Sequence, residues 1–243
     1  MTKHGLRDRL KTMTKYKHLF FDLDRTLWDF EKNSEEVFRD MYRVLKLRRN
    51  GVKDFDEFFS TYRSVNHDLW DLYREGKIDK EFLNFQRFYQ TLFEYGIENK
   101  ALAEEMAKKY VEWSPLKTHL FDGTFELLDY LKPKYHLHII TNGFEEVQTV
   151  KLRESKLEPY FEQVIISETT PVKKPHPKIF QYAMHLAKAN VEDCLMIGDD
   201  IDTDIKGAAG VGMGQIWTNF TRDKSGFKPT FEVNTLLEIK GIL

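Results

Sequence analysis

Short apolar runs alternate with segments of helical period along most of the chain. Five such runs, none longer than seven residues, cover residues 17–23, 137–141, 163–167, 194–198 and 214–218. From the second run onward, the intervening segments carry apolar residues at helical spacing, as at Phe125, Leu128 and Leu131. Runs that are apolar throughout are typical of strands in a parallel sheet that helices cover on both faces. The pattern therefore predicts an α/β fold with a doubly wound parallel sheet.

A long segment between the first and second runs shows no strand pattern. Residues 31–113 instead contain amphipathic stripes, of which the two clearest are Val37, Met41, Val44 and Leu45, and Phe82, Phe85, Phe88, Tyr89, Leu92 and Phe93. Asn33, Asp54 and Asp79 are of the residue types that begin helices, and 16 of the 34 aromatic residues lie in this segment. So many aromatic side chains predict an inserted helical domain with a core of its own.

These patterns divide the chain into three predicted parts. Residues 15–30 and 120–243 form the α/β core, and residues 31–119 form the inserted helical domain. Residues 1–14 are expected to be an unstructured leader, because the sequence Met-Thr-Lys at residues 1–3 recurs at residues 13–15, just before the first patterned segment. Translation could begin at either methionine.

Composition and charge exclude several other classes of protein. Hydrophobic residues make up 41% of the chain and charged residues 31%, which is ordinary for a globular protein. The formal net charge is −2, so no basic excess predicts a nucleic acid partner, and no apolar stretch is long enough to span a membrane. The one cysteine, Cys194, cannot form an internal disulfide. We therefore expect a soluble, cytoplasmic monomer or homodimer.

Polar residues lie at the ends of four predicted strands. They are Asp22 and Asp24 after the first strand, Thr141 and Asn142 at the end of the second, Lys174 in the loop after the third, and Asp199 and Asp204 after the fourth. The carboxyl ends of parallel strands lie at one edge of a sheet, and ligands of open α/β sheets bind beyond that edge. We expect these side chains to meet there.

The residue types at this edge favour metal-assisted phosphoryl transfer. Crowded carboxylates repel one another unless a cation lies among them, and a set of oxygen ligands suits Mg2+. An attacking carboxylate and a phosphoryl group are both anions, so their reaction needs such a cation. Lys174 supplies a second positive charge, and the Thr141 hydroxyl with nearby backbone N–H groups can hold phosphoryl oxygens. The predicted reaction passes through an aspartyl-phosphate.

Four ordered segments, residues 22–26, 141–143, 174–175 and 198–204, resemble the motifs of the haloacid dehalogenase-like (HAD) hydrolase superfamily. The resemblance extends from about residue 16 to the last strand, and the inserted helices resemble the type I cap of that superfamily. It implies that Asp22 is the nucleophile and that Asp24 protonates the leaving group and then activates water. It also implies that Thr141, Asn142 and Lys174 bind the phosphoryl group, and that Asp22, Asp24 (through its backbone carbonyl), Asp199 and Asp204 surround Mg2+. Asp200 and Asp202 match no required position.

The resemblance leaves several activities open. Dehalogenase members lack the second aspartate, so the presence of Asp24 favours a phosphatase over a dehalogenase. A phosphomutase would share the whole core and would differ only in its cap and substrate. A sugar-phosphate phosphatase and a non-catalytic binding protein on the same scaffold are further alternatives.

Residues outside the catalytic set favour one class of substrate. The segment 21–30 and the pair Ser167-Glu168 are similar to a branch of pyrimidine nucleotidases, which implies a small phosphate ester, a nucleoside monophosphate, as the substrate. Two residues depart from the expected pattern. Pro171 stands where a more flexible residue is expected, and His176 replaces the acidic residue common after Lys-Pro.

Two other patterns have structural interpretations. The glycines between residues 207 and 214 follow a helical segment and precede a strand, which is the reverse of the order in a dinucleotide-binding loop. Gly210 is therefore expected to end a helix. His136 and His138 lie at the start of a predicted strand, away from the carboxyl edge, so structural roles are expected for them.

Overall fold

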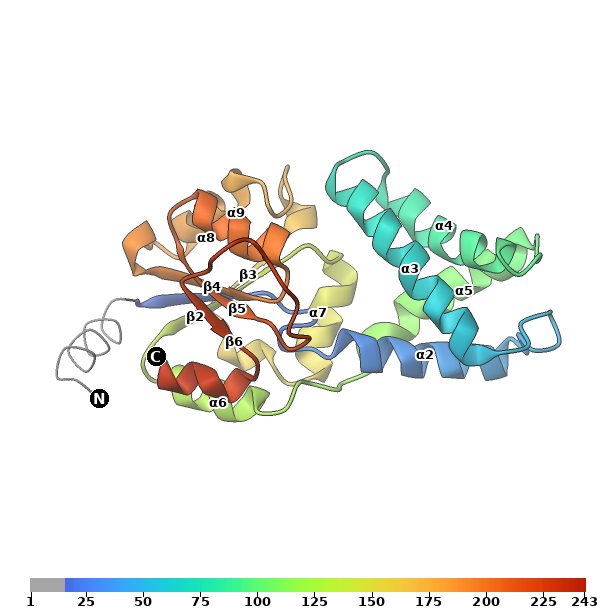
Figure 1. Cartoon of the computed structure of the whole chain (residues 1–243), viewed down its shortest axis with the longest axis horizontal. Helices are drawn as coiled ribbons and strands as arrows, with labels where there is room; N and C mark the ends of the chain where they lie inside the picture. Colours follow the sequence, from blue (N-terminus) through green and yellow to red (C-terminus); the bar gives the residue numbers. More distant parts are fainter. Residues whose placement is uncertain (1–15) are drawn as a thin grey trace. The chain divides into compact units, whose positions relative to one another are not determined.

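The computed structural model describes residues 16–243, so the predicted leader at residues 1–14 lies outside the described residues. The described chain divides into two compact units, coloured along the sequence in Figure 1. Residues 16–30 together with residues 119–243 form the first unit, and Glu31–Thr118 form the second. The first unit contains the sheet, and the second is built from helices.

A six-stranded, wholly parallel sheet lies at the centre of the first unit (Figure 1). Its strands are β1 (His18–Phe21), β2 (His136–Thr141), β3 (Gln163–Ile166), β4 (Cys194–Gly198), β5 (Gly214–Thr218) and β6 (Phe231–Val233). The five predicted strands are confirmed, and β6 is an addition. With only three residues, one of them Glu232, β6 presents no apolar run that sequence reasoning could detect.

Alternating side chains of β1 explain why helices cover both faces of the sheet. Leu19 and Phe21 point into one apolar cluster, whereas Phe20 lies in another, because successive residues of a strand face opposite sides. The helices α6 (Thr124–Leu131) and α7 (Glu145–Glu154) pack into the first cluster, and α8 (Pro177–Leu186) and α9 (Lys206–Gly210) into the second. Figure 1 shows α6 on one side of the sheet and α8 and α9 on the other. The predicted doubly wound fold is confirmed.

The strand order β3-β2-β1-β4-β5-β6 places a switch point between β1 and β4. The chain builds outward from β1 in one direction through β2 and β3, and in the other direction through β4, β5 and β6. Ligands of doubly wound proteins bind outside the carboxyl ends of the strands at such a point. The residues that follow β1 and β4 are therefore the first place to look for a site.

Six single-turn or short helices complete the described chain. They are η1 (Ser114–Leu116), η2 (Glu158–Tyr160), η3 (Ser167–Thr169), η4 (Val191–Asp193), η5 (Ile201–Ile205), which is a π-helix, and η6 (Leu236–Gly241). α9 ends at Gly210 as predicted, and the left-handed residue of the following turn is Gly212, with φ of 86°.

The second unit contains four α-helices, together with η1: α2 (Phe30–Val44, whose first residue belongs to the first unit), α3 (Phe55–Arg74), α4 (Lys80–Phe93) and α5 (Lys100–Trp113). The predicted N-caps Asp54 and Asp79 are confirmed, since their carboxylates accept hydrogen bonds from the backbone N–H groups of Glu57 and Phe82. Asn33 does not begin a helix as predicted. It lies inside α2 and is fully buried.

Aromatic side chains fill the core of the helical unit, as predicted. The Phe38 ring lies within 6.3 Å, centroid to centroid, of the rings of Phe58, Phe59, Tyr62, Phe88 and Tyr110. The ends of the predicted stripes are wrong, however. Val44, Phe82 and Phe93 are exposed, because helical period assigns a residue to a face but cannot show where the neighbouring helices stop covering that face.

Within residues 16–243, no helix combines the length and the apolar composition needed to cross a bilayer.

Replacing Phe38 with alanine should lower the free energy of unfolding by about 3–5 kcal/mol, because it removes a ring from the centre of an aromatic core. Urea denaturation followed by circular dichroism measures this change. The control Phe82→Ala also removes a phenylalanine ring, but from a position where the side chain is 46% exposed. It should change the free energy of unfolding by less than about 0.5 kcal/mol. Equal losses in the two variants would contradict the central position of Phe38.

Candidate active site

The chain turns sharply after β1 and keeps two aspartates at the carboxyl edge of the sheet. The Asp22 N–H donates to Ile197 O at 2.9 Å, which extends the pairing of β1 and β4 by one residue. The N–H groups of Leu27 and Trp28 then both donate to Leu23 O. This compact turn leaves Asp22 buried and Asp24 partly exposed.

A buried lysine joins two of the predicted carboxylates. Lys174 Nζ lies 2.6 Å from Asp22 Oδ1 and 2.6 Å from Asp204 Oδ1, and the lysine side chain is only 2% exposed. Burial alone would lower the pKa of Lys174, but the charges of Asp204 and Asp22 outweigh it and raise this pKa above its usual value. Lys174 therefore stays protonated between its two partners.

The Asn142 side chain fixes the position of Lys174. Asn142 Nδ2 donates to Lys174 O at 2.9 Å, and Asn142 Oδ1 accepts from the Lys174 backbone N–H at 2.9 Å. This reciprocal pair uses the side-chain amide on the backbone of the loop that carries the lysine.

Three carboxylates form an acidic triad beside the lysine. Asp22, Asp199 and Asp204 each offer an oxygen within 4.8 Å of the other two, and within residues 16–243 they are the only group of this kind. Burial raises the pKa of Asp199 well above its usual range, and the charges of Asp22 and Asp204 raise it further. Burial likewise raises the pKa of Asp204 to about 7, although Lys174 opposes the shift. A cation among these carboxylates would relieve their repulsion, and their oxygens are the ligands that Mg2+ prefers.

Local structure after β4 brings Asp199 and Asp204 into this triad. A Cβ atom at Gly198 would overlap the Asp204 carboxylate, so only glycine leaves room for it. Trp217 Nε1 donates to Asp199 O at 2.7 Å, and Thr26 Oγ1 donates to Asp199 Oδ1 at 3.3 Å. The triad thus depends on β1, β4 and β5 together.

Asp200 and Asp202, which match no required position of the four motifs, make only local contacts in the segment after β4. Asp200 Oδ1 accepts from the N–H groups of Asp202 and Thr203 and so caps η5. Asp202 is exposed and pairs with Lys206.

Two residues that the sequence analysis missed hold Asp24. Lys151 Nζ lies 2.5 Å from Asp24 Oδ1, and Gln148 Nε2 donates to Asp24 Oδ2 at 2.8 Å. Gln148 Nε2 also donates to Thr141 Oγ1 at 2.7 Å. Burial lowers the pKa of Lys151, although the Asp24 charge opposes the shift. A lysine and a glutamine in a charged helix look like solvated residues, so nothing in the sequence singles them out.

The predicted site residues therefore form two groups of neighbouring side chains at the carboxyl edge of the sheet. Lys174 joins Asp22 and Asp204, with Asp199 beside them and Asn142 behind the lysine loop. Asp24 and Thr141 form the other group through Gln148. The side chain of Asp24 is not part of the acidic triad.

Other residues named from the sequence lie outside these groups. His176 begins α8, where its Nδ1 accepts from the Lys178 N–H at 3.2 Å, and so it performs the capping role of an acidic residue. His138 is buried in β2 with its Nε2 3.1 Å from His18 Nδ1, and burial lowers the pKa of His138 to about 4. A structural role for His138 agrees with this environment.

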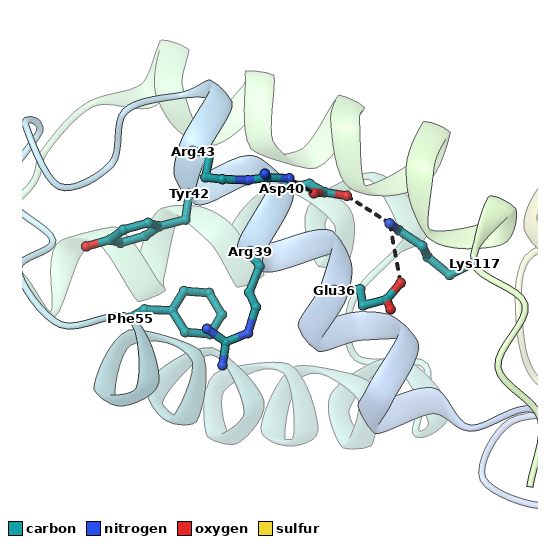
Figure 2. Close-up of a pocket in the computed structure, with 7 residues that line it drawn as sticks. All are labelled: Glu36, Arg39, Asp40, Tyr42, Arg43, Phe55 and Lys117. Atoms are coloured by element: carbon teal, nitrogen blue, oxygen red, sulfur yellow. Dashed lines mark hydrogen bonds and ion pairs between the residues drawn. The ribbon is translucent and has the colours of Figure 1, made fainter.

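A pocket of about 600 Å3 lies within the helical unit (Figure 2). It is lined by Glu36, Arg39, Asp40, Tyr42, Arg43, Phe55 and Lys117. Lys117 Nζ lies 2.8 Å from Asp40 and 3.5 Å from Glu36, and Arg39 pairs with Glu35. Because its basic side chains already hold acidic partners, this pocket is a weaker candidate for an anionic ligand than the carboxyl edge of the sheet.

Residues 16–212 match the family model of the haloacid dehalogenase-like hydrolases. This chain belongs to that family. One HAD relative, the hydrolase YfnB of Bacillus subtilis, is 31% identical over 235 residues, which cover 95% of this chain and 97% of YfnB. The crystal structure of YfnB bound to magnesium matches with a TM-score of 0.86 at 30% identity, covering 94% of this chain and 99% of that one. The predicted superfamily is confirmed.

Two further HAD relatives are pyrimidine 5'-nucleotidases. PynA of Streptococcus pneumoniae is 32% identical over 222 residues, covering 90% of this chain and 91% of PynA. YjjG of Escherichia coli is 32% identical over 235 residues, covering 94% and 98%. The chain is therefore an enzyme of the HAD hydrolase family with nucleotidase relatives.

Replacing Asp199 with asparagine should raise the melting temperature of this HAD hydrolase in metal-free buffer at neutral pH. Because the pKa of Asp199 is raised in the folded state, the folded protein is less stable at a pH above its ordinary value of 3.8. This penalty is largest above the raised pKa, shrinks as the pH falls below it, and is gone below the ordinary value, where the carboxyl is protonated in both the folded and the unfolded state. We expect a gain of at least about 2 °C, since about 1 kcal/mol corresponds to 2–4 °C in a chain of this size. The gain should shrink as the pH is lowered.

Thermal unfolding monitored by circular dichroism provides the measurement. Asp202→Asn is the matched control, because it makes the same change in charge on an exposed side chain of the neighbouring turn. A variant of Asp199 that melts below the wild type at every pH would contradict the repulsion within the triad.

Proposed function

We propose that this HAD hydrolase is a Mg2+-dependent phosphatase that hydrolyses a nucleoside monophosphate through an aspartyl-phosphate. The observation that carries the proposal is the buried Lys174 ammonium, 2.6 Å from Asp22 and from Asp204, beside a triad of carboxylates. The Lys174 ammonium supplies one positive charge, and the carboxylates can hold a metal cation that supplies more. Both suit a reaction between an anionic nucleophile and an anionic phosphate ester.

Asp22 is assigned as the nucleophile. Lys174 occupies Asp22 Oδ1, so Oδ2 is the oxygen that attacks phosphorus. As the new oxygen–phosphorus bond forms, the bond between phosphorus and the ester oxygen breaks, and Asp24 gives its proton to the departing oxygen. A water then attacks phosphorus and loses a proton to Asp24, the bond to Asp22 breaks, and phosphate leaves. Both aspartates return to their starting states.

Lys174, Thr141 and Asn142 are assigned to the transferred phosphoryl group. Thr141 Oγ1 accepts from the Gly143 N–H and from Gln148 Nε2, so its own hydrogen remains for a phosphoryl oxygen. Lys174 places positive charge where negative charge collects. Because the Asn142 amide bonds the lysine loop, its backbone N–H is the donor assigned to the phosphate.

The acidic triad, with the backbone carbonyl of Asp24, would hold Mg2+. The positive charge of a bound Mg2+ would offset the negative charge of the phosphoryl oxygens and of the attacking carboxylate. The donor set supports this assignment, because three buried carboxylates share one lysine. The YfnB structure, which contains magnesium, supports it by similarity.

The similarity to PynA and YjjG supports a pyrimidine nucleoside monophosphate as the substrate. We propose that the helical insertion, residues 31–119, is the cap domain that selects the leaving group. Its aromatic content supports this role, since aromatic rings stack on bases.

Replacing Asp22 with asparagine should lower kcat for phosphate release by at least about 10³-fold, because the amide cannot act as the nucleophile. The assay measures inorganic phosphate released from 4-nitrophenyl phosphate with Mg2+ present. Asp202→Asn serves as the control of equal charge and should retain activity within about twofold of the wild type. Activity of the wild type should also disappear with a chelator and return with Mg2+. A fully active Asp22→Asn variant would contradict the mechanism.

A panel of phosphate esters should show the highest kcat/KM for a pyrimidine nucleoside 5'-monophosphate, at least about tenfold above a hexose phosphate, because specificity is expressed in that ratio. Release of free phosphate distinguishes a phosphatase from a phosphomutase, which transfers the group to a second hydroxyl. A higher kcat/KM for the sugar phosphate would contradict the nucleotide as substrate while leaving the phosphatase chemistry intact.

A further inference from the structure

Both carboxylate oxygens of Asp24 are held by one face of α7. Lys151 Nζ lies 2.5 Å from Oδ1, and Gln148 Nε2 donates to Oδ2 at 2.8 Å. Lys151 and Gln148 are three positions apart in a helix, so they lie on the same side of it. Two donors from one rigid element fix both the position and the plane of the carboxyl group.

Lys151 lies in an environment that holds its side chain in place. The lysine side chain is 4% exposed. Its ammonium lies 4.0 Å from the centroid of the Trp28 ring and 5.9 Å from the centroid of the Phe30 ring. Burying an ammonium is costly unless a carboxylate and well-placed dipoles offset the lost hydration. Trp28 follows Asp24 in the same turn and pairs with it through the backbone, so the aromatic wall and the carboxylate belong to one local structure.

Gln148 connects Asp24 to the residue assigned to the phosphoryl group. Its Nε2 donates to Asp24 Oδ2 and also to Thr141 Oγ1 at 2.7 Å. Gln148 is fully buried, and Gly143 leaves room for it, because a Cβ atom at that position would overlap the glutamine side chain. The distance between the Asp24 carboxyl and the Thr141 hydroxyl is therefore set by a single side chain.

We propose that Lys151 and Gln148 are positioning residues that hold the Asp24 carboxyl in line with the leaving oxygen. The inference rests on the proposed function, in which Asp24 transfers a proton to that oxygen. Proton transfer needs a heavy-atom separation of about 2.6–3.2 Å, and a misplacement of about 1 Å can cost a factor of about 10². Neither residue exchanges a proton in this role.

This role makes a prediction that depends on the leaving group. An alkoxide leaves only with a proton, whereas 4-nitrophenolate is stable enough to leave without one. Removing an anchor of Asp24 should therefore slow the transfer from an alkyl phosphate far more than the transfer from an aryl phosphate. Since kcat/KM covers only the steps up to the first irreversible one, it reports this transfer and not the later attack of water.

The experiment compares Lys151→Met and Gln148→Met with the wild type, in Mg2+, on a pyrimidine nucleoside 5'-monophosphate and on 4-nitrophenyl phosphate. We expect kcat/KM to fall by about 100-fold on the nucleotide in Lys151→Met, at the lower end of the range for general acid catalysis, and by less than about fivefold on the aryl ester. Gln148→Met should show the same selectivity. Two variants keep the test decisive if one of them folds poorly, which the melting temperature reveals.

Lys240→Met is the matched control. Lys240 also pairs with a carboxylate, Glu126 at 2.6 Å, and lies 5.4 Å from the centroid of an aromatic ring, Tyr130. It should retain the kcat/KM of the wild type on both esters. A selective loss in this control, or equal losses on the two esters in Lys151→Met and Gln148→Met, would overturn the inference.

The test also separates the inference from the function on which it rests. If the wild type hydrolyses both esters and Asp22→Asn hydrolyses neither, then equal losses in Lys151→Met overturn only the positioning role. If the wild type releases no phosphate from either ester, the proposed function fails, and the positioning role fails with it.

Discussion

The ion pairs of Lys174 are the interaction on which the rest of the site depends. A buried ammonium by itself would be strongly unfavourable, and so would the buried carboxylates of Asp22 and Asp204. At 2.6 Å from both, the lysine offsets part of each cost, and its raised pKa shows that the attraction exceeds the effect of burial. One lysine cannot neutralise three carboxylates, however. Burial and the charges of Asp22 and Asp204 raise the pKa of Asp199, and a cation bound among the three carboxylates would offset their negative charge.

The fold supplies the distances that these charges need. The three segments that carry Asp22, Lys174 and Asp204 are more than 150 residues apart at their extremes, yet each follows a strand of one parallel sheet. The switch point between β1 and β4 brings the ends of these two strands together, and pairing extends past β1 as far as Asp22. Backbone requirements then decide individual positions, since Gly198 and Gly143 each make room for a side chain that reaches the site.

Most of the fold and much of the site could be predicted from the sequence, for physical reasons. Strands buried on both faces must be apolar throughout, so β1 to β5 are visible as runs, and the residues that end them identify the carboxyl edge. β6 escaped detection because it is short and contains Glu232. The prediction that Asn33 begins a helix is wrong, because Asn33 lies inside α2 with its side chain buried. A residue type that often begins helices acts as an N-cap only where its side chain can accept a hydrogen bond from a backbone N–H group of the first turn.

Lys151 and Gln148 show a different limit. Sequence patterns identify a buried helix face by its apolar residues, but the face of α7 that is buried carries Gln148 and Lys151 beside Leu152. A polar inner face is stable only where partners of opposite character lie opposite it, and here those partners are Asp24 and Thr141. The two contacts with Asp24 join residues more than 120 positions apart in the chain. The inner face of α7 is therefore polar because it lies against a site, and this inference needs the tertiary structure.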